Sequence, residues 1–157
     1  MNKDVIISVV GTQSMDDNDM STMELVTEGK FYKKDNAYYV TYKESEVTGM
    51  EGTTTTLKIA DDIVTLLRFG TVNTQFVFEQ GQKHMAYYDT DNGALTIGVF
   101  TNEINVNLND SGGEISVGYE VEINNLVSAI NGFRVCIREA GDGNNCVKPE
   151  AERLNES

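Results

Sequence analysis

The stretch YYVTYKESEVTGMEGTTTTLKI, from Tyr38 to Ile59, limits the possible folds of this chain more than any other. Tyr38, Val40 and Tyr42 alternate along its first half, and a period of two residues is typical of a β-strand. A glycine-containing corner follows, and alternation resumes through Thr53, Thr55, Leu57 and Ile59. The stretch therefore predicts two extended segments joined by a tight corner.

The same alternation carries polar groups to one end of these strands. Beyond Tyr42, the face that begins with aromatic and branched residues continues to Glu44 and then to Glu46. Because alternate side chains of a strand point to the same side of the sheet, we expect these carboxylates to face inward. The sequence thus predicts an interior that becomes polar toward one end.

Similar short runs fill most of the remaining chain. Turn residues separate them, and no convincing amphipathic helix interrupts them. Gly29 lies inside one run and predicts a bulge or bend there. Besides the two segments above, the expected strands cover 3–13, 22–33, 63–69, 72–79, 84–90, 94–101, 104–108, 114–123 and 126–139.

Successive strands joined by tight turns pair antiparallel, so this order predicts an all-β, up-and-down meander. An open sheet of this size leaves two unpaired edges, and closing it removes them. We therefore expect a single antiparallel β-barrel of about eight to ten strands over residues 1–139, with a two-sheet sandwich as the alternative. The polar residues 140–157 are expected to form a disordered tail.

Charge and cysteine content exclude several classes of function. A net charge of −13 disfavours binding to nucleic acid or to an anionic membrane, and it favours solubility in the cytoplasm. The first apolar run, from Val5 to Val10, is too short for a signal-peptide core or a membrane span. Cys136 and Cys146 are expected to be reduced thiols, with Cys136 unreactive. No metal or cofactor motif occurs in the sequence.

Several segments resemble a known family. These are GTQ at 11–13, TEG at 27–29, the stretch at 38–59, R-x-G at 68–70 and YYDT-x-x-G at 87–93. Together they are similar to the YwiB-like family of small bacterial proteins of uncharacterised function. The resemblance covers about Val5 to Glu139 and implies a calycin (lipocalin-like) β-barrel in a bacterial, cytoplasmic setting. That family provides no established active site to transfer to this chain.

Arg68 is the most informative charged residue, because it follows Val64 and Leu66 on one strand face and so points inward with Glu44. A guanidinium beside the Tyr42 hydroxyl can bind two oxygens of a ligand carboxylate or phosphate. Alternatively, Arg68 pairs with Glu44 and only satisfies a charge inside the barrel. His84, the only histidine, is expected to be a partly exposed structural residue.

Three functions follow from these patterns. The leading one is a barrel that binds a small, anionic molecule in its lumen, contacted by Tyr38, Tyr42, Glu44, Glu46, Thr55 and Arg68. The second is a barrel with a packed interior and no ligand, whose outer strands contact a partner or form a homodimer. The third is an enzyme with Glu44 or Glu46 as acid or base, which is the least favoured because no catalytic set is recognisable. A lumen of a few hundred Å³ would favour the first function, and a solid interior the second.

Overall fold

The structure is a computed structural model of the chain, and it describes residues 3–16, 19–45, 50–71, 73–90, 93–123 and 126–139. All regular elements in these residues are β-strands, so the described part has no helix that could cross a membrane. The predicted tail at 140–157 lies outside the described residues. The strands are β1 Lys3–Asp16, β2 Asp19–Lys34, β3 Ala37–Lys43, β4 Thr54–Ala60, β5 Ile63–Phe69, β6 Asn73–Glu79, β7 Lys83–Thr90, β8 Gly93–Asn109, β9 Gly112–Ile123 and β10 Leu126–Glu139.

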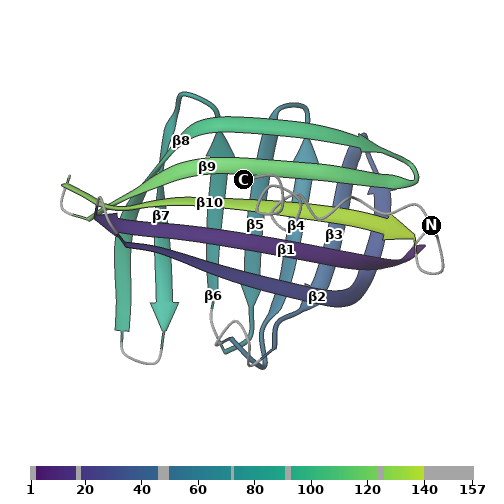
Figure 1. The fold of residues 1–157 in the computed structure, drawn as a ribbon, viewed down its shortest axis with the longest axis horizontal. Coiled ribbons are helices and arrows are strands. Elements are labelled where there is room, and N and C mark those ends of the chain that lie inside the picture. The colour runs from purple at the N-terminus through teal and green to yellow at the C-terminus, as the bar shows by residue number, and fades with distance from the viewer. Residues whose placement is uncertain are drawn as a thin grey trace.

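The strands form one closed antiparallel barrel, as the sequence predicts. Each strand pairs with its neighbours in the chain, and β1 closes the ring by pairing with both β2 and β10. In Figure 1 the long strands β1, β2, β8, β9 and β10 cross the shorter strands β3 to β7. The barrel is therefore flattened into two crossing layers that remain one continuous sheet.

Strand β8 joins the two layers and corrects one prediction. The runs 94–101 and 104–108 are parts of a single strand, whose pairing with β9 shifts between Thr101 and Glu103. A bulge adds one residue to a strand without ending its ladder, so the polar residue Asn102 marks an irregularity and not a turn. The β6–β7 turn packs on this corner, where the Gly81 amide donates a hydrogen bond to the Thr101 carbonyl over 2.8 Å.

Gly29 does not form the predicted bulge. The β1–β2 pairing passes through Val5↔Gly29 without a shift in register. A Cβ atom at Gly29 would lie 2.4 Å from Ile7 Cδ1 and 2.4 Å from the Thr41 carbonyl oxygen. The glycine is therefore required by the close approach of neighbouring strands, which a single sequence does not show.

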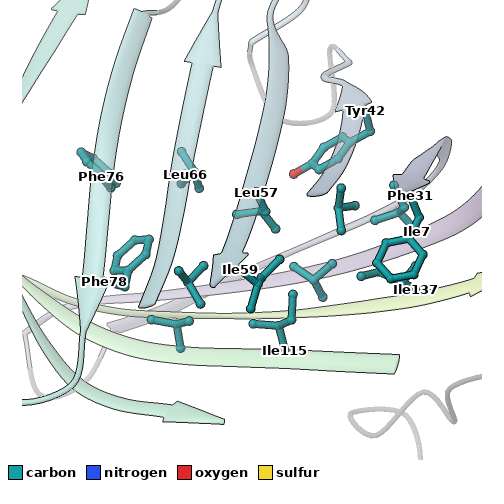
Figure 2. Packing of buried hydrophobic residues seen from close by; sticks show 14 of the residues in the cluster. Ile7, Phe31, Tyr42, Leu57, Ile59, Leu66, Phe76, Phe78, Ile115 and Ile137 are labelled. Atoms are coloured by element: carbon teal, nitrogen blue, oxygen red, sulfur yellow. The ribbon is translucent and has the colours of Figure 1, made fainter. Parts of the chain in front are cut away.

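Side chains fill most of the barrel interior in levels set by the strand register. Val40, Leu57, Leu66 and Phe76 form one level on β3 to β6, and Tyr38, Ile59, Val64 and Phe78 form the next. Figure 2 shows Leu57, Leu66 and Phe76 on adjacent strands of this core. Phe31 and Phe78 are among the largest fully buried side chains, so this end of the interior is packed.

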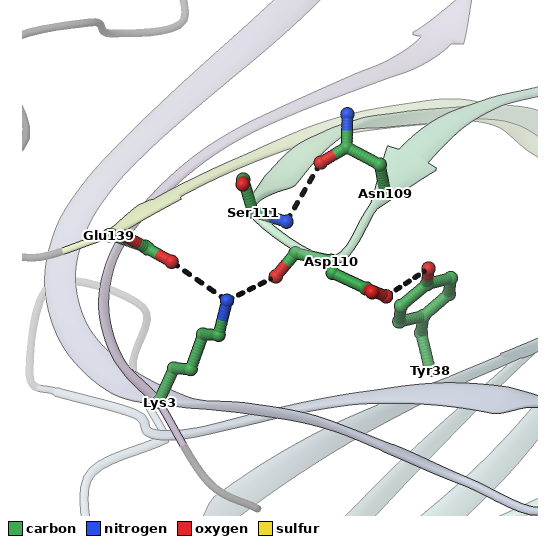
Figure 3. A network of polar contacts seen from close by, with 6 residues as sticks. All are labelled: Lys3, Tyr38, Asn109, Asp110, Ser111 and Glu139. Carbon is green, nitrogen blue, oxygen red and sulfur yellow. Dashed lines mark hydrogen bonds and ion pairs between the residues drawn. The ribbon is translucent and has the colours of Figure 1, made fainter.

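Polar contacts lie near the β8–β9 turn, beside the packed end of the interior. Lys3 Nζ donates hydrogen bonds to the Asp110 carbonyl oxygen at 2.7 Å and to Glu139 Oε1 at 2.8 Å (Figure 3). The Tyr38 hydroxyl donates to Asp110 Oδ1 at 3.0 Å, and the Tyr38 ring stacks on Phe31. These contacts connect the first strand, the β8–β9 turn and the last strand.

Candidate ligand-binding cavity

Four neighbouring strands carry polar side chains at a third level of the interior. The register aligns Tyr42 of β3 with Thr55 of β4, Thr55 with Arg68 of β5, and Arg68 with Thr74 of β6. Tyr42, Thr55 and Thr74 are all buried. This level confirms the predicted change from an apolar to a polar interior.

Glu44 lies just beyond this level and is held by two of its members. The Thr55 hydroxyl donates a hydrogen bond to Glu44 Oε2 at 2.5 Å, and Arg68 Nε lies 3.8 Å from the same oxygen. Only 1% of the Glu44 side chain and 19% of the Arg68 side chain are exposed. A buried carboxylate and a guanidinium therefore compensate each other's charge inside the barrel.

This pair leaves hydrogen-bonding capacity unused. Glu44 Oε1 and Arg68 Nε are buried and have no hydrogen-bond partner among the described residues. At 3.8 Å, the Arg68–Glu44 contact is an ion pair and is too long for a hydrogen bond. The guanidinium therefore has capacity for a further hydrogen-bond acceptor. Such an acceptor would be favourable, because a buried polar atom without a partner destabilises the fold.

Two tyrosine hydroxyls share the electrostatic environment of Arg68. Burial, and then the Glu44 carboxylate, raises the pKa of Tyr42 well above its usual value of 10.0, although the Arg68 charge opposes this. Burial also raises the pKa of Tyr119 on β9, and Arg68 again opposes the shift. Both phenols therefore remain protonated at neutral pH and can donate hydrogen bonds.

A cavity of about 370 Å³ opens on this polar level. Its lining combines an apolar floor with polar groups from strands on both layers of the barrel. Arg68, Tyr42 and Tyr119 supply polar groups from inside the barrel, whereas Gln13 and Ser21 are exposed to solvent. The lining residues are Val9, Gly11, Thr12, Gln13, Ser21, Thr22, Met23, Tyr42, Leu57, Leu66, Arg68, Phe76, Tyr119, Asn131, Gly132, Phe133 and Val135.

Comparison with known proteins establishes the family of this barrel. The model of a family described as "Domain of unknown function (DUF1934)" matches residues 7–134. The chain belongs to the DUF1934 family. The uncharacterised β-barrel protein YwiB of Bacillus subtilis (strain 168) is 29% identical over 108 residues, which span 69% of this chain and 75% of YwiB.

A solved structure supports the fold of this DUF1934 chain. The crystal structure of the ywiB protein from Bacillus subtilis matches with a TM-score of 0.79 and 22% identity. The match covers 88% of this chain and 93% of the crystallised chain. At this identity the likeness supports the all-antiparallel barrel, and the resemblance to the YwiB-like family is confirmed.

The DUF1934 barrel brings together most of the predicted site residues. Tyr42 and Arg68 line the cavity, and Thr55 and Glu44 are linked to Arg68 through the buried ion pair. Tyr38 lies two levels away, where it is bonded to Asp110. Glu46 lies outside the described residues.

The sequence did not indicate the contribution of the opposite layer of this DUF1934 chain. Gln13, Ser21, Tyr119 and Asn131 belong to β1, β2, β9 and β10, which are distant from Arg68 in the chain. Tyr119 was the one detectable member, because it shares the clearly alternating apolar face of β9. The positions of Gln13, Ser21 and Asn131 become known only from the strand pairing of the closed barrel.

The remaining sequence candidates lie elsewhere. His84 is partly exposed, and its Nε2 lies 3.1 Å from Glu79 Oε1. Cys136 is disulfide-bonded, so the expectation that it is a reduced thiol is wrong, and Cys146 lies outside the described residues. The described residues contain no cluster of histidine, cysteine and carboxylate side chains that could hold a metal ion.

Proposed function

We propose that this protein binds a small anionic molecule in the cavity and that Arg68 anchors the anionic group. The observation that carries the proposal is that Arg68 lines the cavity while its pairing with Glu44 forms no hydrogen bond, because the buried Arg68 Nε lies 3.8 Å from Glu44 Oε2 and has no hydrogen-bond partner among the described residues. Arginine can donate two parallel hydrogen bonds to a carboxylate or phosphate, which makes it a suitable anchor in a partly desolvated site.

The size and lining of the cavity support a small ligand with an apolar part. Ligand cavities commonly measure about 300–1,000 Å³, and the 370 Å³ found here lies at the lower end of that range. Leu57, Leu66 and Phe76 form an apolar floor below Arg68. The proposed ligand therefore places an apolar body on this floor and its anionic group against Arg68 and Tyr42.

The ion pair with Glu44 is compatible with this role. A guanidinium has five N–H donors, and Glu44 approaches the Nε side at a distance of 3.8 Å. A ligand anion can therefore bind other donors of Arg68 while Glu44 remains behind it. Glu44, together with Thr55, then positions the guanidinium and does not contact the ligand directly.

The alternative function, an interaction barrel without a ligand, is favoured by two observations. Arg68 already has a buried carboxylate near it, and the other end of the interior is densely packed. The cavity distinguishes the two functions, because a barrel with a purely structural interior has no need for this space beside a charged group. We therefore place ligand binding first.

The proposal includes a cytoplasmic location for the protein and a calycin-like classification of its barrel. The net charge of −13 and the bacterial relative support a cytoplasmic bacterial protein. The disulfide at Cys136 argues against it, because the cytoplasm keeps most thiols reduced. The cavity in an up-and-down barrel is the feature that supports a calycin-like, ligand-binding role.

A thermal-shift screen of anionic metabolites tests the proposal with Arg68→Met. We expect one or more compounds to raise the melting temperature of the wild type but not that of Arg68→Met. Arg134→Met is a matched control, because Arg134 forms a similar ion pair with Glu114 at 3.9 Å and its side chain is 22% exposed. Compounds that stabilise wild type and Arg68→Met equally would refute the anchor role.

A double variant keeps this test valid if Arg68→Met alone is unstable. Removing the cation leaves Glu44 buried without its partner, which commonly costs about 3–5 kcal/mol of stability. Glu44→Gln combined with Arg68→Met removes both charges at once. The proposal requires that this folded double variant also fails to respond to the compounds that stabilise the wild type.

A further inference from the structure

Charged side chains are scarce around the cavity, although the chain as a whole is rich in them. Among the described residues that line the cavity, Arg68 alone has a charged side chain. The polar remainder is neutral and includes the amides of Gln13 and Asn131 and the hydroxyl of Ser21. The described walls therefore offer a ligand one positive charge and no negative charge.

Glu44 already offsets the charge of Arg68 from behind the cavity wall. Glu44 does not line the cavity, but its Oε2 lies 3.8 Å from Arg68 Nε and only 1% of its side chain is exposed. Solvent screens a buried carboxylate weakly, so its field also acts on an anion that binds Arg68. One negative charge on a ligand can pair directly with Arg68, whereas a second charge meets only the repulsion of Glu44.

The other donors near Arg68 are neutral. Tyr42 and Tyr119 line the cavity from opposite layers of the barrel. Burial is the main cause of the raised pKa of both phenols, so they stay protonated at neutral pH. They can donate hydrogen bonds to the oxygens of an anion, but they add no positive charge. The site thus suits the two oxygens and single charge of a carboxylate.

The net charge of the protein and the volume of the cavity restrict the ligand further. The net charge of −13 raises the energy of every additional negative charge that enters the barrel. A water molecule in the liquid occupies about 30 Å³, so the cavity of about 370 Å³ accommodates roughly a dozen non-hydrogen atoms. Leu57, Phe76 and Phe133 line the space that these atoms would fill, so most of them are expected to be apolar.

We propose that the cavity selects a singly charged, apolar carboxylate over a doubly charged phosphate ester, and that the buried charge of Glu44 sets this selectivity. The inference rests on the proposed function, because it requires that the anion pairs with Arg68. At equal distance, Glu44 repels a dianion with twice the energy with which it repels a monoanion. Glu44 is therefore a residue that determines specificity through its charge, without contacting the ligand.

Isothermal titration calorimetry of the full chain tests this selectivity with three probes that share a phenylethyl body. Phenylpropanoate carries one negative charge, phenylpropanamide carries none, and phenylethyl phosphate carries two at about pH 8, because the second pKa of a phosphate ester is about 6. We expect the wild type to bind phenylpropanoate at least about tenfold more tightly than either of the other two probes.

Glu44→Gln tests the role of Glu44, because it removes the charge and keeps an oxygen that can accept the Thr55 hydrogen bond. Doubling the repulsion energy squares the fold-change, so a gain of about threefold for phenylpropanoate corresponds to about tenfold for phenylethyl phosphate. Glu114→Gln is the matched control, since Glu114 pairs with Arg134 at 3.9 Å and does not line the cavity. This control should change neither affinity.

The outcomes separate this inference from the proposed function. A wild type that binds phenylethyl phosphate as tightly as phenylpropanoate would overturn the selectivity, and this comparison needs no variant to fold. If Arg68→Met then lost both probes, the anchor role of Arg68 would stand and only the selectivity would fail. An equal gain for both probes in Glu44→Gln, or the same gains in Glu114→Gln, would overturn the role of Glu44. A wild type that binds neither anion would overturn the inference, whereas the wider screen of anionic metabolites decides the proposed function.

Discussion

Tyr42 connects the two properties of the site, because both the buried carboxylate of Glu44 and the guanidinium of Arg68 act on the pKa of its hydroxyl. Burial is the main cause of its raised pKa, and the Glu44 carboxylate adds to it. Arg68 opposes this shift at both Tyr42 and Tyr119. The field of one arginine thus extends over two phenols from opposite layers of the barrel, which is the arrangement that a polar ligand group would meet.

These shifts predict a loss of stability at alkaline pH. In the unfolded chain Tyr42 ionises near its usual pKa of 10.0, whereas in the folded chain its pKa is higher. The folded state therefore binds more protons above pH 10, and its free energy of unfolding falls as the pH rises through that region. Below pH 10 the contribution of the Tyr42 hydroxyl to the free energy of unfolding is fully present.

Urea denaturation at pH 9 and pH 11 measures this effect. We expect the wild type to lose more stability between the two values than Tyr42→Phe, which has no hydroxyl to ionise. Tyr32→Phe serves as a control. If Tyr42→Phe and the wild type lose the same stability, the hydroxyl does not reside in the buried environment described here.

At the scale of residues, the sequence predicted the inward direction of Glu44 and Arg68 from strand alternation alone. Their contact required only the short β3–β4–β5 meander, whose pairing is local. Gln13 and Asn131 could not be predicted in the same way, because their place at the cavity depends on the pairing of β1 with β10. Local periodicity contains no information on this long-range register.

At the scale of elements, close approach between neighbouring strands explains features that sequence patterns leave ambiguous. Gly29 suggested a bulge or a bend, yet its ladder contains no bulge and the space beside it is filled by Ile7 and the backbone of Thr41. Asn102 suggested the end of a strand, yet β8 continues through a bulge at this point. In both cases the strand itself was predicted correctly. The sequence did not show, however, that Gly29 reflects close packing and that Asn102 marks a bulge.

Gly29→Ala tests the role of close approach. The added Cβ would lie 2.4 Å from a backbone oxygen, which cannot move without disturbing β3, so we expect a loss of about 2–3 kcal/mol of stability. Gly118→Ala is the control, because no atom lies within 4 Å of its added Cβ. It should change stability by less than about 0.5 kcal/mol, or stabilise slightly. Chemical denaturation compares the two, and an equal effect would contradict the packing explanation.

At the scale of the whole molecule, one closed sheet separates three regions with different properties. Its interior is packed near Phe31 and Phe78, whereas a cavity opens where the polar level begins. Its outer surface is strongly acidic but exposes large apolar side chains on β5 and β7. The barrel itself was predictable from turns and alternation, since closure is the simplest way to protect the edges of a long meander. The depth of the cavity was not predictable, because it depends on how side chains from distant strands fill the space.

Native mass spectrometry of wild type, Arg68→Met and Arg134→Met, each incubated with the same anionic compounds, tests the central claim most directly. The account predicts a one-to-one complex with at least one compound for wild type and Arg134→Met, and at least about tenfold lower occupancy for Arg68→Met. A wild type that binds none of the compounds, or equal occupancy in wild type and Arg68→Met, would contradict the claim that Arg68 anchors a ligand inside this barrel.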